Sequence, residues 1–445
     1  TRTATLNGRT ATSVYTQASR TAVTTSPAGR TSTTVMDAQG RLAEARVPGL
    51  AAVAVSRDGR GRPIGLSQTD GAETRALSFG YGPHGFLQTV TDPLGRAVNY
   101  DHDMVGRVTR QTLPDGREIR YQYDANGNLA SLTPPGRPAH VFTYTPVDLT
   151  ADYTPPAAGL GTPQTSYQYN PDRQLTRITR PDGQTLSFDH DSAGRLSALT
   201  IPTGSYSYGY NGVGKLAQIT APDSTLAYGY SGALPVQTTW GGGIGGSVGF
   251  GYDNDFRVRE IAVNGQNPVA YQYDPDSLLV RAGDLALSRD AQNGLPTGST
   301  LGAVTDRLTR DGFGEVATYS AAHSGTNLLD LAYTRDALGR ITQKVETIQG
   351  QATTHAYTYD LAGRLVEVKR DGATVAAYGY DANGNRTQVD GATVATVDEQ
   401  DRLLAHAGAS YAHTANGELK TKTQGGQTTS YDYDVLGNLR RAALP

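Results

Sequence analysis

The sequence contains no cysteine, one tryptophan, seven phenylalanines and no long apolar run. Without cysteine the chain has no disulfide and no zinc site built on thiolates. Its longest apolar stretch, GLAAVAV from Gly49 to Val55, is far too short to cross a bilayer. Lysine and arginine are scattered and the formal net charge is -3, so no basic patch is present to attract a nucleic acid or an anionic membrane. We therefore expect no nucleic-acid partner and no membrane insertion.

Tyrosine, by contrast, is abundant, with 26 residues against 7 phenylalanines. A tyrosine hydroxyl needs a partner or water when its ring is buried, so this composition predicts half-buried walls rather than a thick dry core. Glycine and proline together make up about 17% of the chain, below the roughly 25% that suggests disorder. The composition predicts a folded chain that is rich in turns.

One pattern of nine residues recurs along the chain. YTYDLAGRL begins at Tyr357, YQYDANGNL at Tyr121, YGYDANGNR at Tyr378 and YDYDVLGNL at Tyr431, and a longer variant, YSYGYNGVGKL, begins at Tyr206. Tyrosines two positions apart share one face of an extended strand. Aspartate is favoured at the first position of a type I turn, and glycine supplies the left-handed conformation that closes a bulged hairpin. Each copy therefore predicts a strand, a four-residue turn and the next strand.

We expect the tyrosines, aspartates and closing glycines of these copies to act as structural strand and turn residues. The residues are Tyr121, Tyr123, Asp124, Gly127, Tyr206, Gly214, Tyr357, Tyr359, Asp360, Gly363, Tyr378, Tyr380, Asp381, Gly384, Tyr431, Tyr433, Asp434 and Gly437.

A second kind of turn alternates with the first. It has the sequence Pro-Asp-Gly at Pro114–Gly116 and Pro181–Gly183, where proline pre-sets the backbone for the turn. Gly106 and Gly116 are 10 residues apart, and Gly116 and Gly127 are 11 residues apart. The turns therefore alternate about every ten residues and leave strands of about six residues, which predicts an antiparallel meander.

The quality of the repeat divides the chain into four parts. Residues 1–75 carry weak, Thr-rich copies, and residues 76–129 carry clear ones. Residues 130–165 are Pro-rich and are either decayed copies or an excursion out of the sheet. Clear copies resume over residues 166–445 and are expected to continue beyond the end of the sequence. The chain has no signal peptide at its start, so we expect a piece of a longer polypeptide.

So many short strands in one meander cannot form a flat sheet, because strand twist accumulates. A β-propeller of this length would have about ten blades of four strands, against the usual four to eight, so it is the weaker alternative. The pattern favours an antiparallel ribbon that coils.

The Y-x-Y-D-x-x-G-[RN]-L copies, from about Met36 to Leu439, resemble the RHS or YD repeats of bacterial polymorphic toxins, insecticidal toxin complexes and animal teneurins. The resemblance implies an all-β fold in which YD-repeat hairpins form an antiparallel meander coiled into a spiralling, hollow β-sheet shell, or cocoon. It implies a non-enzymatic shell segment of an exported bacterial protein, secreted or at the cell surface. In bacterial members such a shell encloses a toxic C-terminal domain.

The expected partner is therefore a C-terminal effector or toxin domain of the same polypeptide, with secretion-machinery or surface components as further candidates. One departure from the toxin type is that no D-P-x-G core segment follows the repeats. Two other functions remain open. One is an extracellular adhesion or carbohydrate-binding module, and the other is a polysaccharide-active enzyme, which needs two carboxylates about 5 to 9.5 Å apart.

Four patterns resemble sites but have simpler structural explanations. The Gly-rich stretch matches G-x-G-x-x-G at Gly241–Gly246 and G-x-S-x-G at Gly245–Gly249, yet both sites need a following helix and another repeat strand is expected there. DANGN at Asp124 and Asp381 lacks the later glycine and glutamate of a calcium loop. The histidines stand singly, without metal-binding spacing.

Three of those histidines occupy the slot of the second motif tyrosine, which indicates a packing role. They are His102, His190 and His413. We expect no catalytic residue, no metal and no cofactor.

Overall fold

The computed structural model describes residues 1–159, 161 and 163–445, so Leu160 and Thr162 of the Pro-rich stretch lie outside the described residues. The described residues form 44 β-strands and no helix. Consequently no helix long and apolar enough to cross a membrane is found among them. Within each compact unit the paired strands are consecutive in sequence and antiparallel. The predicted all-β antiparallel meander is confirmed.

The chain forms two compact units, each built from two separate segments. Unit 1 contains residues 1–100 and 249–375, and unit 2 contains residues 101–248 and 376–445. We name the two parts of each unit its early and late segments. The chain passes between the units within β10 (Ala97–His102), β24 (Gly246–Tyr252) and β36 (Ala373–Tyr380).

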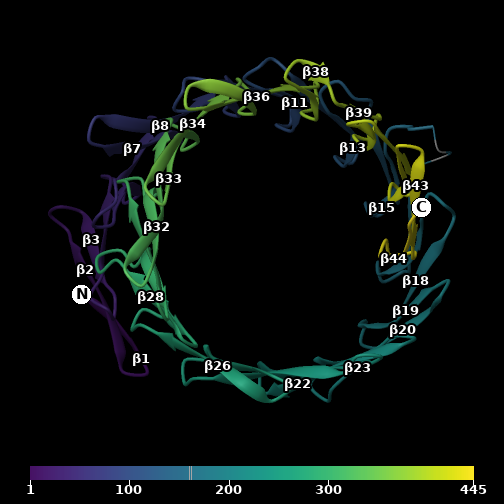
Figure 1. Cartoon of the computed structure of the whole chain (residues 1–445), viewed down its shortest axis with the longest axis horizontal. Helices are drawn as coiled ribbons and strands as arrows, with labels where there is room; N and C mark the ends of the chain where they lie inside the picture. Colours follow the sequence, from purple (N-terminus) through teal and green to yellow (C-terminus); the bar gives the residue numbers. More distant parts are fainter. Residues whose placement is uncertain (160, 162) are drawn as a thin grey trace. The chain divides into compact units, whose positions relative to one another are not determined.

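In unit 1 the early and late segments lie side by side, as the purple strands β2 and β3 and the green strands β28 and β32 show in Figure 1. The early strands are β1 (Arg2–Leu6), β2 (Arg9–Thr16), β3 (Thr21–Thr25), β4 (Thr31–Met36), β5 (Leu42–Arg46), β6 (Val53–Arg57), β7 (Pro63–Asp70), β8 (Glu73–Tyr81) and β9 (Leu87–Thr91). The late strands are β25 (Val258–Val263), β26 (Gln266–Tyr273), β27 (Leu279–Ala282), β28 (Leu285–Arg289), β29 (Pro296–Leu301), β30 (Val304–Arg310), β31 (Val316–His323), β32 (Thr326–Arg335), β33 (Ile341–Ile348), β34 (Gln351–Tyr359) and β35 (Leu365–Arg370).

Unit 2 has the same organisation, and its Pro-rich stretch contributes paired strands to the early segment. The early strands are β11 (Val108–Thr112), β12 (Glu118–Tyr123), β13 (Leu129–Thr133), β14 (His140–Tyr144), β15 (Thr150–Thr154), β16 (Thr165–Tyr169), β17 (Leu175–Thr179), β18 (Thr185–His190), β19 (Leu196–Ile201), β20 (Gly204–Tyr210), β21 (Leu216–Thr220), β22 (Ser224–Ser231) and β23 (Leu234–Gly242). The late strands are β37 (Arg386–Val389), β38 (Ala392–Thr393), β39 (Ala395–Val397), β40 (Leu403–His406), β41 (Ala409–His413), β42 (Leu419–Gln424), β43 (Gln427–Tyr433) and β44 (Leu439–Ala443).

Two sets of turns border each segment. We call the turns that follow the motif tyrosines YD turns, and the turns that alternate with them counter turns. Because consecutive strands are antiparallel, the YD turns lie along one edge of a segment and the counter turns along the other. In the late segments many counter turns have only two residues, both with positive φ, such as Asn264 and Gly265 at 51° and 67°. This is the type I′ geometry that suits a tight hairpin.

The sheet has little buried core. Among the described residues only five hydrophobic side chains are buried, three of which, Leu186, Ile201 and Val435, form one cluster in unit 2. The accessible surface is 24988 Å², whereas a compact protein of 47.0 kDa exposes about 16,000 Å² and two compact domains of half that mass about 20,000 Å². Each unit is therefore a thin wall rather than a packed globule.

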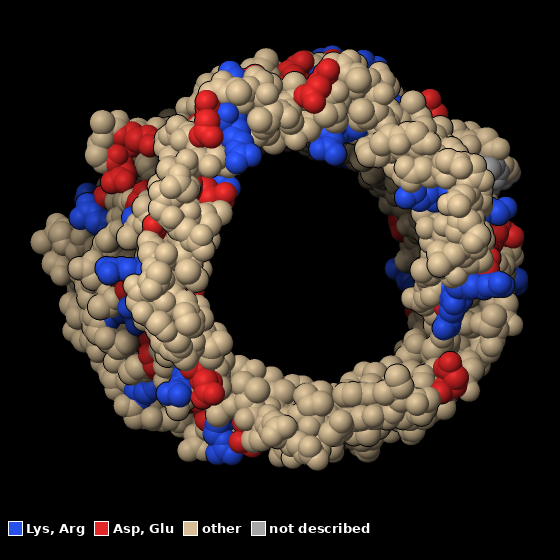
Figure 2. All heavy atoms as spheres, in the orientation of Figure 1, with Lys and Arg blue, Asp and Glu red and all other residues tan. Residues whose placement is uncertain are grey.

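Charges of both signs are interspersed on the face drawn in Figure 2. The part formed by β22 and β23 is uncharged there, in agreement with a sequence that has no charged residue from Ser224 to Tyr252.

Candidate functional site

The second tyrosine of the motif fastens its strand to the preceding repeat. The Tyr359 hydroxyl, at the end of β34, donates to the backbone carbonyl of Ile341 in β33 at 2.8 Å. The ladder between these strands ends at the pair Gln343↔Ala356, so the carbonyl lies beyond the last pair. The Arg340 guanidinium lies over the Tyr359 ring, 4.4 Å from its centroid. The tyrosine therefore satisfies a backbone group where the strands diverge, a contact that contributes about 1 kcal/mol.

The same tyrosine clamp recurs in both units. Its hydroxyl-to-carbonyl bonds are Tyr81 to Pro63, Tyr123 to Val108, Tyr144 to Leu129, Tyr169 to Thr150, Tyr210 to Leu196, Tyr230 to Leu216 and Tyr273 to Val258. A cation covers the ring in the pairs Arg62 with Tyr81, Arg107 with Tyr123, Arg195 with Tyr210, Lys215 with Tyr230 and Arg257 with Tyr273.

The motif aspartate holds the YD turn closed. Asp360 Oδ1 accepts from the Arg364 backbone N–H at 2.9 Å, and Asp360 Oδ2 accepts from Arg364 Nε at 2.7 Å. The N–H of Gly363, which has φ 84°, donates to the Asp360 carbonyl at 3.0 Å. Burial raises the pKa of Asp360, but the N–H and guanidinium of Arg364 outweigh this effect and hold the pKa below its ordinary value. The carboxylate therefore stays ionised as a turn cap.

The other motif aspartates do the same with asparagine in place of arginine. Asp124, Asp381 and Asp434 each accept from the backbone N–H and the side-chain amide of the residue four positions on. The remaining closing glycines also have positive φ, at Gly127 (94°), Gly214 (82°), Gly384 (101°) and Gly437 (82°).

The first motif tyrosines lie in the strand ladders rather than in the turns. Their cross-strand partners are Leu132 for Tyr121, Leu199 for Tyr206, Val368 for Tyr357, Val389 for Tyr378 and Ala442 for Tyr431. Tyr380 and Tyr433 stand at the bulge and pair with Arg386 and Leu439.

The Gly-rich stretch forms a hairpin between β23 and β24. Both the G-x-G-x-x-G and the G-x-S-x-G motif require a following helix. The described residues contain no helix, and β24 begins at Gly246. Gly246 lies against the ring of Trp240, and a Cβ there would be 2.5 Å from Trp240 Cζ2. The glycines therefore allow close approach of the strand to the tryptophan.

Two of the weighed histidines stand at the bulge position of the motif. His190 pairs with Leu196 and His413 with Leu419, in the register in which Tyr359 pairs with Leu365. His102 is the last residue of β10. Burial, helped by Arg402, lowers the pKa of His413, so this ring is neutral at neutral pH.

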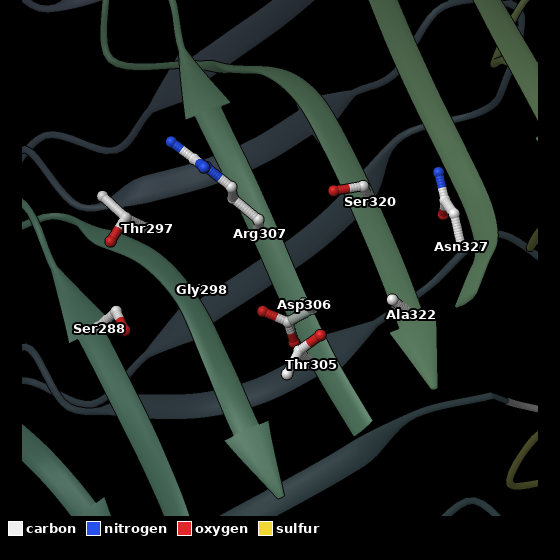
Figure 3. A pocket seen from close by; sticks show the side chains of 9 residues that line it. All are labelled: Ser288, Thr297, Gly298, Thr305, Asp306, Arg307, Ser320, Ala322 and Asn327. Atoms are coloured by element: carbon white, nitrogen blue, oxygen red, sulfur yellow. The ribbon is translucent and has the colours of Figure 1, made fainter. Parts of the chain in front are cut away.

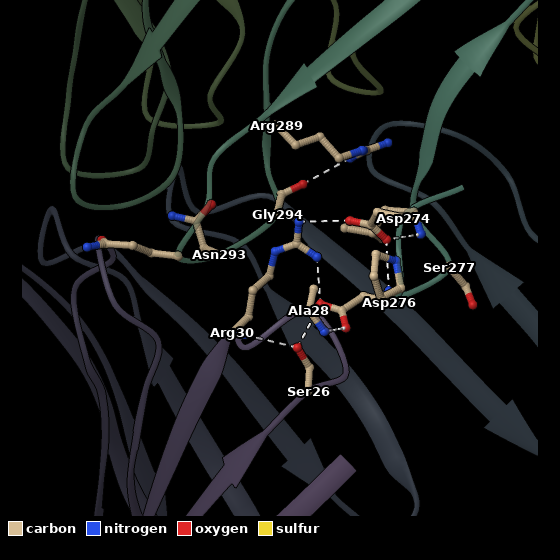
Figure 4. A network of polar contacts seen from close by, with 12 residues as sticks. Ser26, Ala28, Arg30, Asp274, Asp276, Ser277, Arg289, Asn293 and Gly294 are labelled. Atoms are coloured by element: carbon tan, nitrogen blue, oxygen red, sulfur yellow. Dashed lines mark hydrogen bonds and ion pairs between the residues drawn. The ribbon is translucent and has the colours of Figure 1, made fainter. Parts of the chain in front are cut away.

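A network of ion pairs joins the two segments of unit 1 (Figure 4). Arg30, which follows the counter turn after β3, binds Asp276 at 2.5 Å and Asp274 at 2.8 Å in a YD turn of the late segment. The Asp276 carboxylate also accepts from Ser26 Oγ at 2.7 Å and the Ala28 N–H at 2.8 Å. The Arg30 and Asp276 side chains are 15% and 12% exposed, so the pair is largely shielded from water. We name this line of contacts between counter turns and YD turns the seam.

Other arginines occupy equivalent places in unit 1. Arg9 lies between two neighbouring YD turns, with Asp255 at 2.6 Å on one side and Ser277 Oγ at 2.8 Å on the other. Arg75 binds Glu315 at 3.1 Å and lies over the Phe313 ring at 3.8 Å. A counter-turn arginine thus inserts between YD-turn tips.

The seam of unit 2 has the same chemistry. Arg137 binds Asp381 at 2.5 Å and Asp401 at 2.8 Å. Arg180 binds Glu418 and donates to the Val435 carbonyl. The further bonds run from Arg117 Nη1 to the Ala382 carbonyl, from Gln400 Nε2 to the Pro156 carbonyl and from Asn416 Nδ2 to Asp182 Oδ2.

The seam was not predicted, because the arginines were taken as scattered charges. Arg75, Arg96 and Arg117 are 21 residues apart, and Arg137 follows 20 residues later. This spacing equals the YD repeat, offset to the counter turn, and it is the signal that could have revealed the seam.

A polar hollow of 570 Å³ lies on one face of β28 to β32 in unit 1 (Figure 3). Gly298 pairs with both Ser288 and Arg307. A Cβ at Gly298 would be 2.3 Å from the Asp306 carbonyl oxygen, so the close approach of the strands requires glycine there. Asp306 is the one carboxylate among the lining residues, and it accepts from Ser299 at 2.7 Å. The lining therefore lacks the two facing carboxylates that glycoside hydrolysis needs. Over the described part of the chain, no three metal-ligating side chains are grouped to hold a metal ion.

The family model described as Teneurin YD-shell matches residues 2–444. No curated protein matches the chain. Among solved structures, TcdB2-TccC3 aligns with a TM-score of 0.67 and 14% identity, covering 97% of this chain and 32% of that one. TcdB2-TccC3-Cdc42 aligns with a TM-score of 0.68 and 14% identity, covering 97% and 30%.

The Photorhabdus luminescens Tc holotoxin pore aligns with a TM-score of 0.60 and 13% identity, covering 98% of this chain and 30% of that one. At such identity the likeness shows a shared fold. The present chain spans about a third of the length of these chains.

Proposed function

Because this chain belongs to the Teneurin YD-shell family, we propose that it is a non-enzymatic wall segment of an exported bacterial protein. In this proposal the coiled wall is hollow, and it encloses or carries a C-terminal effector domain of the same polypeptide. The protein acts outside its producer, secreted or at the cell surface. The observation that carries the proposal is the family match over residues 2–444.

The chemistry of the repeat supports a structural role. The tyrosine clamps close the sheet between neighbouring strands. The seam arginines join residues that are far apart in sequence, by 246 positions for Arg30 and Asp276 and 244 for Arg137 and Asp381. The Asp360 and Asp381 carboxylates have pKa values below the ordinary one and are bound by their turns, so they are ill suited to take up a proton at neutral pH. A wall that encloses another domain needs these closures and needs no reactive group.

Protease protection tests the proposal. In the complete gene product, a segment that follows Pro445 should resist a soluble protease under native conditions. The same segment expressed alone should be cleaved, and the Arg30→Ala/Arg137→Ala variant should expose it by weakening both seams. Equal cleavage of the segment in the complete product and alone would show that the wall encloses nothing.

A further inference from the structure

The polar hollow of 570 Å³ in unit 1 lies on one face of the strands β28 to β32. A row of cross-strand partners crosses this face, namely Ser288, Gly298, Arg307, Ser320 and Asp330. Successive side chains of a strand point to opposite faces, so the neighbouring pair Leu308 and Tyr319 belongs to the other face. The hollow therefore lies on a hydrophilic face of the wall.

The side chains around the hollow have hydrogen-bonding capacity that the chain does not use. The lining includes Ser288, Thr297, Thr305, Arg307 and Ser320. Figure 3 shows Arg307 between Thr297 and Ser320, which come from the strands on either side. No hydrogen bond or ion pair from the described residues reaches the Arg307 guanidinium or the four hydroxyls. A cation and several hydroxyls are therefore available to a ligand.

Arg307 differs in this respect from the other arginines of the same strands. Arg289 donates to the Gly294 carbonyl at 2.9 Å, and Arg310 donates to the Gly314 carbonyl at 2.7 Å. Both are thus bound by turns, whereas Arg307 is exposed on the strand face. A guanidinium binds an oxyanion with two parallel N–H···O bonds, and neighbouring hydroxyls can donate to the same group. The hollow therefore has the donors that an oxyanion requires.

The charges near the hollow indicate which oxyanion it suits. Four aspartates are close to it, and each accepts a hydrogen bond from another group of the chain, namely Asp290, Asp306, Asp311 and Asp330. Asp290 and Asp311 line an adjoining hollow of 270 Å³ that Arg307 also lines, but no ion pair within the described residues joins either of them to Arg307. Because like charges repel, one guanidinium near several carboxylates suits a single negative charge better than a phosphate dianion. A carboxylate is therefore the better match.

We propose that this hollow binds a hexuronate unit of an acidic polysaccharide, with the sugar carboxylate on Arg307 and the sugar hydroxyls on the serine and threonine hydroxyls. A hydroxyl both donates and accepts, so a polyhydroxylated ligand matches this lining. The hollow is within the range of about 300 to 1,000 Å³ that is typical of ligand sites. An acidic peptide fits less well, because the backbone groups of these strands are paired in ladders and cannot add a further strand. The inference is independent of whether the wall encloses another domain.

Calorimetric titration of the 445-residue chain tests this inference. The probes are an oligogalacturonate and a glucuronate-containing oligosaccharide, and the methyl ester of each is the matched ligand without charge. At least one of the two acids should bind, and esterification should weaken its binding at least about tenfold, because the charge-assisted hydrogen bonds to Arg307 are lost. Binding of neither acid overturns the proposal. Binding of inorganic phosphate or polyglutamate as tight as that of the acidic saccharide also overturns it, because the site would then not recognise a sugar.

Variants locate the site in the same assay. Arg307→Gln should weaken binding of the acid at least about tenfold, and Arg307→Lys should weaken it less, because lysine keeps the charge but not the planar fork. The matched control is Arg177→Gln, which removes an exposed strand-face arginine of unit 2 that pairs with Gln168 and Ser187, and it should leave the affinity unchanged. Thermal unfolding of each variant verifies that it is folded. Unchanged affinity in Arg307→Gln, or an equal loss of affinity in Arg177→Gln, overturns the proposal.

Discussion

The counter turns of the early and late segments differ, although they occupy the same edge of the same repeat. Early counter turns such as Ser26–Gly29 and Leu113–Gly116 have four residues, and Arg30 and Arg117 follow directly and reach the late segment. Late counter turns such as Ser324-Gly325 have two residues, and a Cβ added at Gly325 meets no heavy atom within 4 Å. The residue behind the turn therefore decides whether an edge makes contacts, since Arg9 reaches the late segment from behind the two-residue turn Asn7-Gly8.

Two aspartates at tight turns show that the residue at the turn also decides which backbone group the edge binds. Asp70, the last residue of β7 before a two-residue turn of the early segment, accepts from the Gly312 N–H of the late segment at 2.9 Å. Asp371, in a late two-residue turn, instead accepts from the N–H of Thr354 in its own hairpin at 2.8 Å. In this late turn the aspartate thus satisfies a backbone group of its own hairpin. We call the counter-turn edge of the early segments, which contacts the late segments, the contacting edge. We call the counter-turn edge of the late segments the closed edge.

Acidification should weaken the ion pairs at the contacting edge, and this should be the largest loss of stability. Burial raises the pKa of Asp276, but the Ala28 N–H, Ser26 and Arg30 outweigh it and lower the pKa below the ordinary 3.8. A carboxylate with a lowered folded-state pKa stabilises the protein above the unfolded pKa, and this stability is lost as the pH falls through the folded value. The urea midpoint should therefore fall steeply only below about pH 4, after a smaller decrease between pH 7 and pH 5 in which His413, whose pKa is lowered in the folded state, is protonated more readily in the unfolded chain.

Amide exchange localises that effect. After correction for intrinsic rates, the Ala28 N–H, which is bonded to Asp276, should lose protection below about pH 4 before the hairpin amides around Gly325 do. A steep loss of stability between pH 7 and pH 5 would contradict the assignment of the seam carboxylates.

Removing one seam arginine should have the next largest effect. Arg30→Ala leaves Asp274 and Asp276 without their cation in a site where the side chains are 12% exposed, which should cost about 3 kcal/mol of unfolding free energy. The matched control is Arg46→Ala, which breaks a pair with Glu44 in which the arginine is 56% exposed, and it should cost less than about 1 kcal/mol. Urea unfolding measures both. Equal losses of unfolding free energy would mean that the shielded seam pair stabilises the protein no more than an exposed ion pair does.

The repeat explains why the fold was predictable and the seam was not. Tyrosines two positions apart and Asp-x-x-Gly turns specify a strand and a hairpin within nine residues. The meander therefore follows from local sequence. The partner of Arg30 lies 246 residues away in sequence, at a distance set by the accumulated twist and bend of many strands. No short motif states that distance. The divisions at residues 75, 129 and 165 concern repeat quality and stay predictions.

Only part of the role of the second motif tyrosine could be predicted from the sequence. The pattern placed Tyr357 and Tyr359 on one strand face, but the carbonyl that Tyr359 binds belongs to Ile341, in the neighbouring strand. The arginine that covers its ring is likewise in the preceding repeat, at Arg340. Both contacts depend on where the ladder ends, which sequence alone does not state.

Lengthening a counter turn should destabilise the contacting edge more than the closed edge, although both losses should be smaller than those above. Four residues of Gly-Ser inserted between Gly425 and Gly426, at the closed edge of unit 2, should cost about 1 kcal/mol or less, because longer surface loops add little closure entropy. The same insertion between Asp115 and Gly116 should cost about 2 kcal/mol, because it displaces the Arg117 bond to the Ala382 carbonyl. Urea midpoints compare the two variants. Equal tolerance would show that the Arg117 contact does not contribute.

The smallest effect should distinguish the two tyrosines of one motif. Tyr359→Phe removes the hydroxyl that binds the Ile341 carbonyl at 2.8 Å and leaves the ring under Arg340, so it should cost about 1 kcal/mol. Tyr357→Phe, two positions earlier in the ladder opposite Val368, should cost only a few tenths of a kcal/mol, because its ring rather than its hydroxyl makes the cross-strand pair. Urea unfolding resolves this difference, and amide exchange of the Ile341 region should rise only in Tyr359→Phe. If the two variants lose equal stability, the hydroxyl clamp is not what holds neighbouring repeats together, and the ring packing alone must explain the closure of the sheet at the YD-turn edge.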